Sequence, residues 1–414
     1  MFENKTESTK AVLAAADLGE YDAERSMDEL EELARTAGAQ VIARLTQKRP
    51  SFDSGTCIGE GKLAELAELC EKLSPELIIF DHELTATQVR NIENITKVRV
   101  VDRTTLILDI FAQRAVSAEG KLQVELAQQR YRLPRLAGMG VVLSRLGAGI
   151  GTRGPGETKL ETDKRHIRRR ITALEKELEE LSRRREFGRR RRKKDNVLTA
   201  AIVGYTNVGK STLLNRLTDA GVLAEDKLFA TLDTTSRGLE LPDGRSILLT
   251  DTVGLIQRLP HHLVEAFKST LEEAAASDLI LHVIDASSPD AAEQAKVTQA
   301  LLSELGCDGI PQLQVLNKTD LAEGTAFPED DKTVCISAKT GQGFDRLLDC
   351  IVKNLPQTAC RMRLLIPYGQ TAVISRIRAE GKIFAEEFVA DGTRVDALVD
   401  AKLCSALEGY KCGE

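Results

Sequence analysis

At 414 residues the chain has the length of about two to three domains, and a hydrophobic share of 42% supplies enough apolar side chains for ordinary cores. Charged residues make up 29%, beside 30 glycines and 11 prolines, which excludes collagen-like, mucin-like and disordered chains. There is no run of 18 apolar residues, and the N-terminus MFENKTESTK lacks the apolar core of a signal peptide. We therefore expect a cytoplasmic protein without a membrane span.

The eight cysteines are scattered along the chain. None belongs to a CxxC pair and no histidines stand at zinc-finger spacing, so the pattern predicts neither a disulfide framework nor a structural metal site. We expect reduced, mostly buried thiols at Cys57, Cys70, Cys307, Cys335, Cys350, Cys360, Cys404 and Cys412.

Charge is distributed unevenly. In total, 57 Lys and Arg oppose 63 Asp and Glu, and the net charge of −6 by itself argues against a nucleic-acid partner. Residues 164–194, however, carry 15 basic and 5 acidic side chains, a net charge of +10, which leaves −16 for the rest of the chain. One segment therefore holds the whole basic surplus.

Residues 1–118 alternate short apolar runs with helical patterns. Strands are predicted at 12–17, 39–45, 77–81 and 98–102, and helices at 27–38, 61–73 and 85–96. This alternation predicts an N-terminal α/β domain with a largely parallel sheet. Its SGTCIGEGK stretch (54–62) weakly resembles a phosphate-binding loop, but a tight turn before a helix whose exposed face begins at Lys62 is the favoured interpretation.

Residues 119–195 are predicted to form an arm, an antiparallel hairpin of helices at 120–136 and 160–192. Seam positions in both helices step alternately by four and three residues, at Leu122, Leu126, Gln129, Leu133 and Leu136, and at Ile167, Ile171, Leu174, Leu178 and Leu181. The tip, residues 137–157, holds seven glycines, Arg145, Arg153 and one acid. It combines a flexible backbone with positive charge.

Residues 196–356 repeat the α/β pattern over a longer stretch, with strands predicted at 199–204, 247–251, 279–285, 313–317 and 334–337. Residues 357–414 predict a small α+β domain: a strand, a helix at 371–381, a hairpin at 386–400 that turns at Asp391-Gly392, and a final helix at 402–410. The fold class is therefore multidomain α/β.

A phosphate-binding loop follows the first strand of the second α/β stretch. Gly204-Tyr205-Thr206-Asn207-Val208-Gly209-Lys210-Ser211 matches GxxxxGK[ST] between a strand and a helix. Backbone N–H groups at a helix N-terminus bind anions, Lys210 can reach the β- and γ-phosphates, and the Ser211 hydroxyl can ligate Mg²⁺. We predict that these eight residues and Thr212 bind the phosphates of the nucleotide.

Three further motifs follow at strand ends. Asp251-Thr252-Val253-Gly254 supplies a Mg²⁺ carboxylate in Asp251 and a γ-phosphate donor in the Gly254 N–H. In Asn317-Lys318-Thr319-Asp320, the Asp320 carboxylate can accept both N1–H and N2–H of guanine, a pattern that adenine cannot offer. The backbone of Ser337-Ala338-Lys339 can donate to guanine O6. Four motifs in this order predict a guanine-nucleotide site.

These motifs resemble those of translation-factor-related GTPases with a Ras-like P-loop domain, and three segments narrow the resemblance to the HflX family: residues 151–171, 228–235 and 251–273. The resemblance implies that Thr231 closes on Mg²⁺ and the γ-phosphate, so Lys210, Thr231 and Gly254 are the catalytic candidates. From residue type alone, Thr231, Thr234 and Thr235 compete. The family often has proline at the position of Thr234, so the stiffness of this segment differs here.

Two side chains bear on the rate of hydrolysis. Leu255 stands where a Ras-like protein carries its water-positioning glutamine, so we expect slow hydrolysis by the isolated protein, whether or not Leu255 also packs beneath the site. Asn207 has two interpretations that stay open: it tolerates the turn geometry, or its carbonyl holds a K⁺ ion, as in related GTPases with asparagine there.

The basic segment suits phosphate contact more than base stacking, because Phe187 is its one interleaved aromatic residue. A solvated charged face is the alternative, but the charge asymmetry favours RNA. The HflX resemblance implies a protein that binds the large ribosomal subunit and splits or rescues stalled or idle ribosomes under stress. We expect the protein to be a monomer. A GTP-gated assembly chaperone and an ATP-dependent RNA-remodelling N-domain are the competing hypotheses. The candidate RNA-binding residues are Arg145, Arg153, Arg168, Arg169, Arg183, Arg184, Arg185, Arg189, Arg190, Arg191, Arg192, Lys193 and Lys194.

Overall fold

The computed structural model describes residues 9–144, 155–194, 197–218, 228–229, 234–258, 263, 272–322 and 330–412, without the side chains of 137–144, 155–160, 193, 380 and 402. The chain separates into two units. Unit 1 contains residues 1–184, 225–233 and 258–269, and unit 2 contains residues 185–224, 234–257 and 270–414. None of the helices in the described part of the chain combines the length and the hydropathy that a membrane crossing needs.

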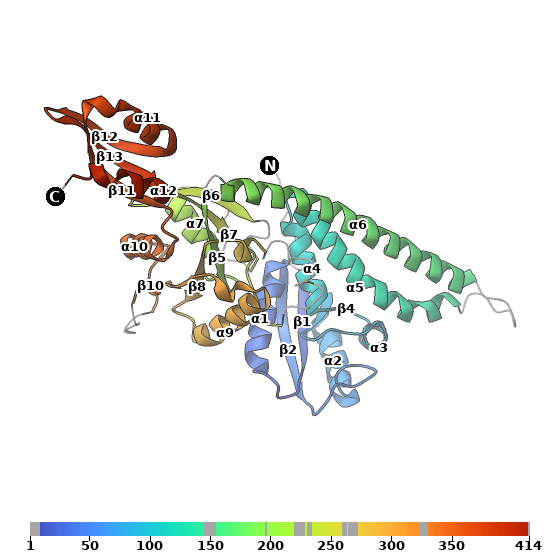
Figure 1. The fold of residues 1–414 in the computed structure, drawn as a ribbon. Coiled ribbons are helices and arrows are strands. Elements are labelled where there is room, and N and C mark those ends of the chain that lie inside the picture. The colour runs from blue at the N-terminus through green and yellow to red at the C-terminus, as the bar shows by residue number, and fades with distance from the viewer. Residues whose placement is uncertain are drawn as a thin grey trace, which may run out of the picture. The chain divides into compact units, whose positions relative to one another are not determined.

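Unit 1 is built on a four-stranded parallel sheet with the strand order β2-β1-β3-β4 (Figure 1). Helices make the crossovers that parallel strands require. The predicted α/β alternation is confirmed, with strands β1 (Thr9–Asp17), β2 (Ala39–Lys48), β3 (Leu77–Phe80) and β4 (Arg99–Asp102), and helices α1 (Ala23–Thr36), α2 (Glu60–Leu73) and α3 (Ala86–Thr96).

Local side-chain signals determine where these helices begin. The Asp22 carboxylate accepts hydrogen bonds from the N–H groups of Glu24 and Arg25 at the start of α1. Thr85 forms a capping box with Gln88 at the start of α3. Each cap satisfies N–H groups that have no partner within the helix, so the ends of the crossovers are well defined.

A further helix, α4 (Arg103–Arg114), was not predicted and follows β4 without a loop, and α5 (Ala118–Ser144) packs against α3 and α4. The buried side chains of α5 include Val124, Ala127 and Tyr131, whereas the predicted seam position Leu122 is only half-buried. The seam prediction for this helix was therefore incomplete. Its wider apolar face serves the core of unit 1.

Helix α6 (Pro155–Lys194) confirms the predicted long second helix of the arm. Ion pairs join it to α5, with 2.6 Å between Arg170 Nε and Glu125 Oε1 and 2.8 Å between Arg130 Nη2 and Glu175 Oε1. Leu174 is buried, and the other predicted seam positions of α6 are half-buried between exposed neighbours. The tip was predicted to begin at residue 137, but α5 continues to Ser144, so that boundary was wrong.

Unit 2 contains a six-stranded sheet with the order β10-β9-β8-β5-β7-β6, parallel except for the antiparallel edge strand β6. The five predicted strands are confirmed, and β6 was missed. The elements are strands β5 (Leu198–Gly204), β6 (Thr235–Glu240), β7 (Ser246–Asp251), β8 (Leu279–Asp285), β9 (Gln312–Asn317) and β10 (Thr333–Cys335), and helices α7 (Lys210–Thr218), α9 (Ala291–Glu304) and α10 (Phe344–Asn354).

The C-terminal part of unit 2 is the predicted small α+β fold, a three-stranded antiparallel sheet in the order β11-β13-β12. It comprises β11 (Ala359–Ile366), α11 (Thr371–Glu380), β12 (Gly381–Val389), β13 (Gly392–Asp400) and α12 (Ala401–Leu407). The structure pairs Cys360 with Cys404, with the two Cα atoms 6.7 Å apart, so the prediction of reduced thiols was wrong for these two. The packing of α12 on β11 brings them together across 44 residues of sequence.

Candidate functional site

Glycines shape the loop between β5 and α7. Gly209 has a φ of +93° and Asn207 a φ of +61°, in the left-handed region that glycine and asparagine tolerate best. A Cβ at Gly204 would lie 2.3 Å from the Val283 carbonyl oxygen, and a Cβ at Gly209 would lie 2.4 Å from the amide nitrogen of Asn317. The loop therefore lies closer to β8 and β9 than any side chain at these two positions would allow.

The Lys210 ammonium is buried inside this loop. Lys210 is only 6% exposed, and its Nζ donates hydrogen bonds to the carbonyl oxygens of Gly204 at 3.1 Å and Tyr205 at 2.7 Å. Burial lowers the pKa of Lys210 to about 8, and the nearby Asp251 carboxylate opposes that shift. The loop carbonyls thus hold a cation beside the N–H groups that open α7.

Two oxygen ligands for a divalent cation lie together at the start of α7 and the end of β7. Ser211 Oγ donates to Asp251 Oδ2 at 2.7 Å, and Asp251 is fully buried. The described residues hold no cluster of three or more His, Cys, Asp or Glu side chains that could bind a metal. A hydroxyl and one carboxylate fit Mg²⁺, which in nucleotide sites takes few protein ligands and completes its octahedron with phosphates and water. When bound, the ion would neutralise charge on the β- and γ-phosphates.

The segment after β7 lies against the phosphate loop. A Cβ at Gly254 would lie 2.7 Å from Thr206 Cγ2 and 3.2 Å from Lys210 Nζ, so only glycine fits this approach. The next residue, Leu255, is 2% exposed, and its carbonyl accepts a hydrogen bond from the Thr206 N–H at 2.8 Å. The Leu255 side chain is thus a packing group, as one of the two predicted roles requires.

Asn317 links the phosphate loop to the expected base site. Its Nδ2 donates to the Val208 carbonyl at 2.7 Å, and its Oδ1 accepts from the Ala338 N–H at 2.8 Å. Asp320 Oδ1 is buried and has no hydrogen-bond partner within the described ranges. Because a buried carboxylate oxygen without a donor is costly, this atom is suited to a ligand that supplies N–H groups.

Comparison with known proteins shows which family this chain belongs to. Three family models match consecutive parts of the chain: "GTP-binding GTPase N-terminal" at residues 24–112, "GTP-binding GTPase Middle Region" at 114–192 and "50S ribosome-binding GTPase" at 199–318. GTPase HflX of Caldanaerobacter subterraneus subsp. tengcongensis is 51% identical over 99% of this chain and 95% of its own. This chain belongs to the GTPase HflX family. GTPase HflX of Escherichia coli is 41% identical over 95% of this chain and 94% of its own.

As a member of the HflX family, the chain is a GTP hydrolase. The family resemblance in the phosphate-loop, Asp251 and Asp320 motifs is therefore confirmed at the level of the family and its reaction. Among solved structures, a GTP-binding protein from Sulfolobus solfataricus in complex with GDP is 27% identical, with a TM-score of 0.44 over 83% of this chain and 98% of that one.

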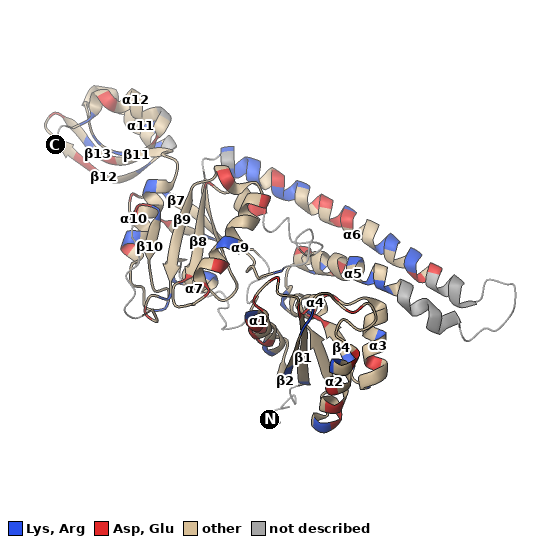
Figure 2. Cartoon of the chain, turned by 90° about the horizontal axis from the view of Figure 1, so that it is seen from below, with Lys and Arg blue, Asp and Glu red and all other residues tan. Residues whose placement is uncertain are grey.

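Several predicted HflX site residues lie outside the residues that the structure describes. These are Thr231, Arg145 and Arg153, together with the side chain of Lys193. Among the other candidates for RNA contact, three are half-buried, namely Arg185, Arg189 and Arg192. The exposed candidates are Arg168, Arg169, Arg183, Arg184, Arg190, Arg191 and Lys194. The colours of the ribbon in Figure 2 show that basic and acidic residues are mixed along α6.

The weak phosphate-loop resemblance in unit 1 is not matched by the geometry of a phosphate loop. The Gly59 N–H donates to Gln47 Oε1 at 2.8 Å, and Lys62 Nζ pairs with Glu65 at 2.8 Å on the first turns of α2. Asp53 Oδ1 accepts from the Gly55 N–H at 2.8 Å, which closes the turn. These contacts favour the turn interpretation.

Two acidic residues of unit 2 that form ion pairs were not among the predicted site residues. Asp285 at the end of β8 pairs with Lys318 Nζ at 2.7 Å and so orients the segment before Asp320. Glu273 accepts hydrogen bonds from Arg189 of the basic segment. Neither contact follows from sequence spacing, because each joins residues from separate elements.

Proposed function

We propose that this HflX-family GTPase is a GTP-gated factor that binds the large ribosomal subunit and splits or rescues stalled or idle 70S ribosomes, in the cytoplasm and under stress. The observation that carries the proposal is the match of residues 199–318 to a family model described as a 50S ribosome-binding GTPase. The buried Asp320 oxygen and the Ser211–Asp251 pair support guanine and Mg²⁺ as what this region holds.

The arm supplies the proposed contact with ribosomal RNA. Its long helix α6 exposes arginines such as Arg168, Arg169 and Arg184, and a cationic helix neutralises phosphates without reading bases. We propose four domains for this monomeric protein: an N-terminal domain (1–118), the arm (119–195), a GTPase domain (196–356) and a C-terminal domain (357–414).

The γ-phosphate is the proposed trigger. With GTP bound, Thr231 and the Gly254 N–H close on the γ-phosphate and Mg²⁺, and hydrolysis removes the contacts that order both segments. Lys210 stabilises the charge on the transferred phosphate. Leu255 has no group that can orient a water molecule, so the ribosome is expected to complete the site; a K⁺ ion at Asn207 is a further candidate for added charge.

The first experiment measures GTP hydrolysis by the full chain against increasing concentrations of purified large subunits. We expect turnover to rise at least about tenfold with saturating subunits, as for other GTPases completed in trans. Sedimentation of 70S particles with GTP or a non-hydrolysable analogue then reports splitting. A hydrolysis rate that large subunits leave unchanged rejects the proposal.

A second candidate is a GTP-gated assembly chaperone in which hydrolysis is not the main output. It is favoured by one observation, the buried apolar Leu255 at a position that could otherwise have activated water. The variants Asp251→Asn and Thr231→Ala separate the two functions. A chaperone keeps its effect on subunit assembly with uncleaved nucleotide bound, whereas a recycling factor completes a single round and stays on the subunit.

A further inference from the structure

Arg258 is the residue at which the chain passes from unit 2 back into unit 1. It follows Gly254 by four positions, and the structure describes every residue between them. Its backbone φ is +52°, in the left-handed region that is unfavourable for a long side chain. Such a conformation persists only where the surrounding structure holds the residue in place.

The Arg258 side chain lies at the carboxyl edge of the N-terminal sheet. In the strand order β2-β1-β3-β4, the chain leaves β1 to one side and then returns to the other, so the topological switch lies between β1 and β3. Open parallel sheets bind ligands at this point, outside the carboxyl ends of the strands. Tyr21 follows β1 and Asp81 directly follows β3, and both contact Arg258.

Three groups surround the Arg258 guanidinium at this edge. Its Nη2 forms an ion pair with Asp81 and donates a hydrogen bond to the Ser26 hydroxyl. Its Cζ lies 4.0 Å from the centre of the Tyr21 ring. Ser26 Oγ in turn donates to Asp81 Oδ2 at 2.7 Å, which fixes the carboxylate. An ion pair, a hydrogen bond and a cation–π contact on one planar cation make this a binding site for a guanidinium group.

The charges of the site require a cation at the position of Arg258. Arg103 Nη1 donates to Asp81 Oδ1 at 3.0 Å, and Arg103 Nη2 pairs with Glu29. The side chains of Asp81 and Arg103 are only 1% and 4% exposed. With Arg258, these two carboxylates face two guanidinium groups. Without it, the network would keep one net negative charge, which is costly for buried groups.

The residues before Arg258 are attached to the phosphate loop of unit 2. The Leu255 N–H donates to the Gly204 carbonyl at 3.3 Å, and the Gln257 N–H donates to the Tyr205 hydroxyl at 2.7 Å. One peptide bond separates the Gln257 contact from Arg258. A change in the backbone of Arg258 therefore acts directly on a residue that contacts the phosphate loop.

We infer that Asp81 is a positioning residue for GTP: by binding Arg258 it maintains the unfavourable backbone conformation there and so keeps the Gly254 N–H in place for the γ-phosphate. The inference rests on the proposed γ-phosphate contact of Gly254 and is independent of the ribosome. GDP has no γ-phosphate, so loss of the guanidinium site should weaken the binding of GTP and leave the binding of GDP unchanged.

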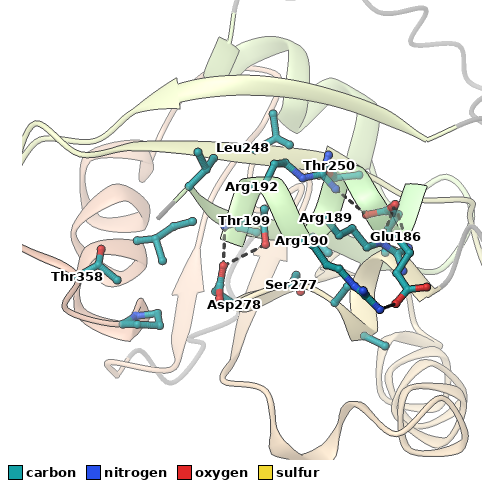
Figure 3. A pocket seen from close by; sticks show the side chains of 18 residues that line it. Glu186, Arg189, Arg190, Arg192, Thr199, Leu248, Thr250, Ser277, Asp278 and Thr358 are labelled. Carbon is teal, nitrogen blue, oxygen red and sulfur yellow. Dashed lines mark hydrogen bonds and ion pairs between the residues drawn. The ribbon is translucent and has the colours of Figure 1, made fainter. Parts of the chain in front are cut away.

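Unit 2 contains a matched ion pair that serves as a control. Arg189 lines a cavity of about 590 Å³ (Figure 3), and its Nη2 lies 3.0 Å from Glu273 Oε1. The Arg189 side chain is 24% exposed, close to the 30% of Arg258. The variant Arg189→Gln therefore tests whether the loss of any partly buried ion pair has the effect expected for Arg258.

The main experiment measures the binding of GDP and of a non-hydrolysable GTP analogue, each with Mg²⁺, to the full chain by titration calorimetry. In Arg258→Gln the affinity for GDP should stay within about twofold of wild type. If the released segment adopts the binding conformation for about one fifth of the time, the affinity for the analogue falls about fivefold. Arg189→Gln should keep the wild-type ratio of the two affinities. An unchanged ratio in Arg258→Gln, or an equal fall in Arg189→Gln, overturns the inference.

Variants of the carboxylate test the same contact from the other side. Asp81→Asn keeps the size of the side chain but removes its charge, and should lower the ratio as Arg258→Gln does. Combining the two changes should add nothing, and additive effects would contradict the inference. Arg258→Lys should restore part of the ratio, because an ammonium group can still pair with Asp81. If Asp81→Asn does not fold, Arg258→Gln decides alone, because Asp81 there keeps its hydrogen bond from Arg103.

Hydrogen exchange separates this inference from the proposed function. With GDP bound, the N–H groups of Leu255 and Gln257 should exchange at least about tenfold faster in Arg258→Gln, because their hydrogen bonds to the phosphate loop open more often. Exchange of Leu249 in β7 should not change. Unchanged exchange at Leu255 and Gln257 overturns the inference. If Gly254→Ala keeps the wild-type ratio of affinities, the proposed γ-phosphate contact fails, while the exchange rates still decide whether Arg258 holds the segment.

Discussion

At the scale of single residues, the site combines strict geometry with incomplete hydrogen bonding. Gly204, Gly209 and Gly254 each leave no space for a Cβ, so sequence and structure agree at these positions. Asp320 has a buried oxygen without a donor within the described ranges, and His282 has a buried Nε2 in the same situation. The Asp320 oxygen is suited to a ligand that supplies N–H groups, whereas the buried His282 ring bears on the stability of unit 2.

The first prediction concerns Asp320→Asn. The change replaces the acceptor for guanine N2–H by an N–H₂ donor and leaves only a neutral acceptor for N1–H, so neither charge-assisted hydrogen bond remains. At about 1.5 kcal/mol for each of the two, this corresponds to roughly 100-fold weaker GTP binding. Xanthosine triphosphate carries a carbonyl in place of that amino group and should bind the variant better than the wild type, because the asparagine amide donates to it. Competition binding with both nucleotides measures this; a variant that still prefers GTP contradicts the assignment of Asp320.

The second prediction concerns His282 in β8, where burial lowers the pKa to about 4. The unfolded chain protonates this group near pH 6.5, so between pH 6.5 and 4 the unfolded state binds more protons and the free energy of unfolding rises with pH. Unit 2 should therefore lose about 3 kcal/mol of stability as the pH falls through that window.

His282→Gln, which cannot titrate, should flatten this dependence. Urea unfolding followed by circular dichroism at several pH values measures the slope in both proteins. An equal slope in the wild type and the variant would show that other groups cause the acid sensitivity.

At the scale of elements, α6 has three kinds of arginine along one helix. Arg170 pairs with α5, Arg189 pairs with Glu273, and residues such as Arg168 and Arg184 extend into solvent. The sequence pattern assigned nearly all of the cluster to RNA, because a run of like charge carries no information on which side chain meets a carboxylate from another element. The exposed set is the better candidate for phosphate contact.

The third prediction replaces Arg168, Arg169 and Arg184 by glutamine. If each contacts one phosphate, the slope of log affinity for large subunits against log salt should decrease in magnitude by about 2, at roughly 0.7 to 0.9 per contact. Filter binding between about 50 and 200 mM salt measures the slope. Lys353→Gln, which removes an exposed cation of α10 paired with Asp331, is the control and should leave the slope unchanged.

At the scale of the whole molecule, the nucleotide motifs and the N-terminal sheet belong to different units. Residues 204–211, 251–254, 317–320 and 337–339 all lie in unit 2, whereas β1 to β4 lie in unit 1. Arg258, which follows the Gly254 segment in the sequence, is grouped with unit 1 and forms an ion pair with the buried Asp81 of that unit.

The fourth prediction is that GDP stabilises the two units unequally. A ligand at 100 times its dissociation constant adds about 2.7 kcal/mol to the free energy of unfolding of the structure that binds it. Hydrogen exchange of β5 should slow accordingly, and exchange of β1 should change by less than about 0.5 kcal/mol. Equal protection of both sheets would mean that the units unfold as one.

Much of this protein could be read from sequence, because the signals concerned are local. Alternating apolar runs predicted the strands, the phosphate loop is defined by residues adjacent in the chain, and each nucleotide motif follows a strand whose carboxyl end leads to the same edge of the sheet. The order of those motifs indicates a GTPase, and the segments 151–171, 228–235 and 251–273 carry the resemblance to the HflX family. Because the chain belongs to the GTPase HflX family, its reaction, GTP hydrolysis, follows from sequence comparison and does not depend on the tertiary structure.

Other features depend on residues that are distant in sequence and therefore needed the tertiary structure. Helix α5 buries a second face because α3 and α4 lie against it, β6 joins the sheet as an edge strand with no strong pattern of its own, and Cys360 meets Cys404 only through packing of the last sheet. Whether an arginine of α6 faces solvent or Glu273 is decided in the same way. Packing brings such groups together, and sequence spacing does not record it.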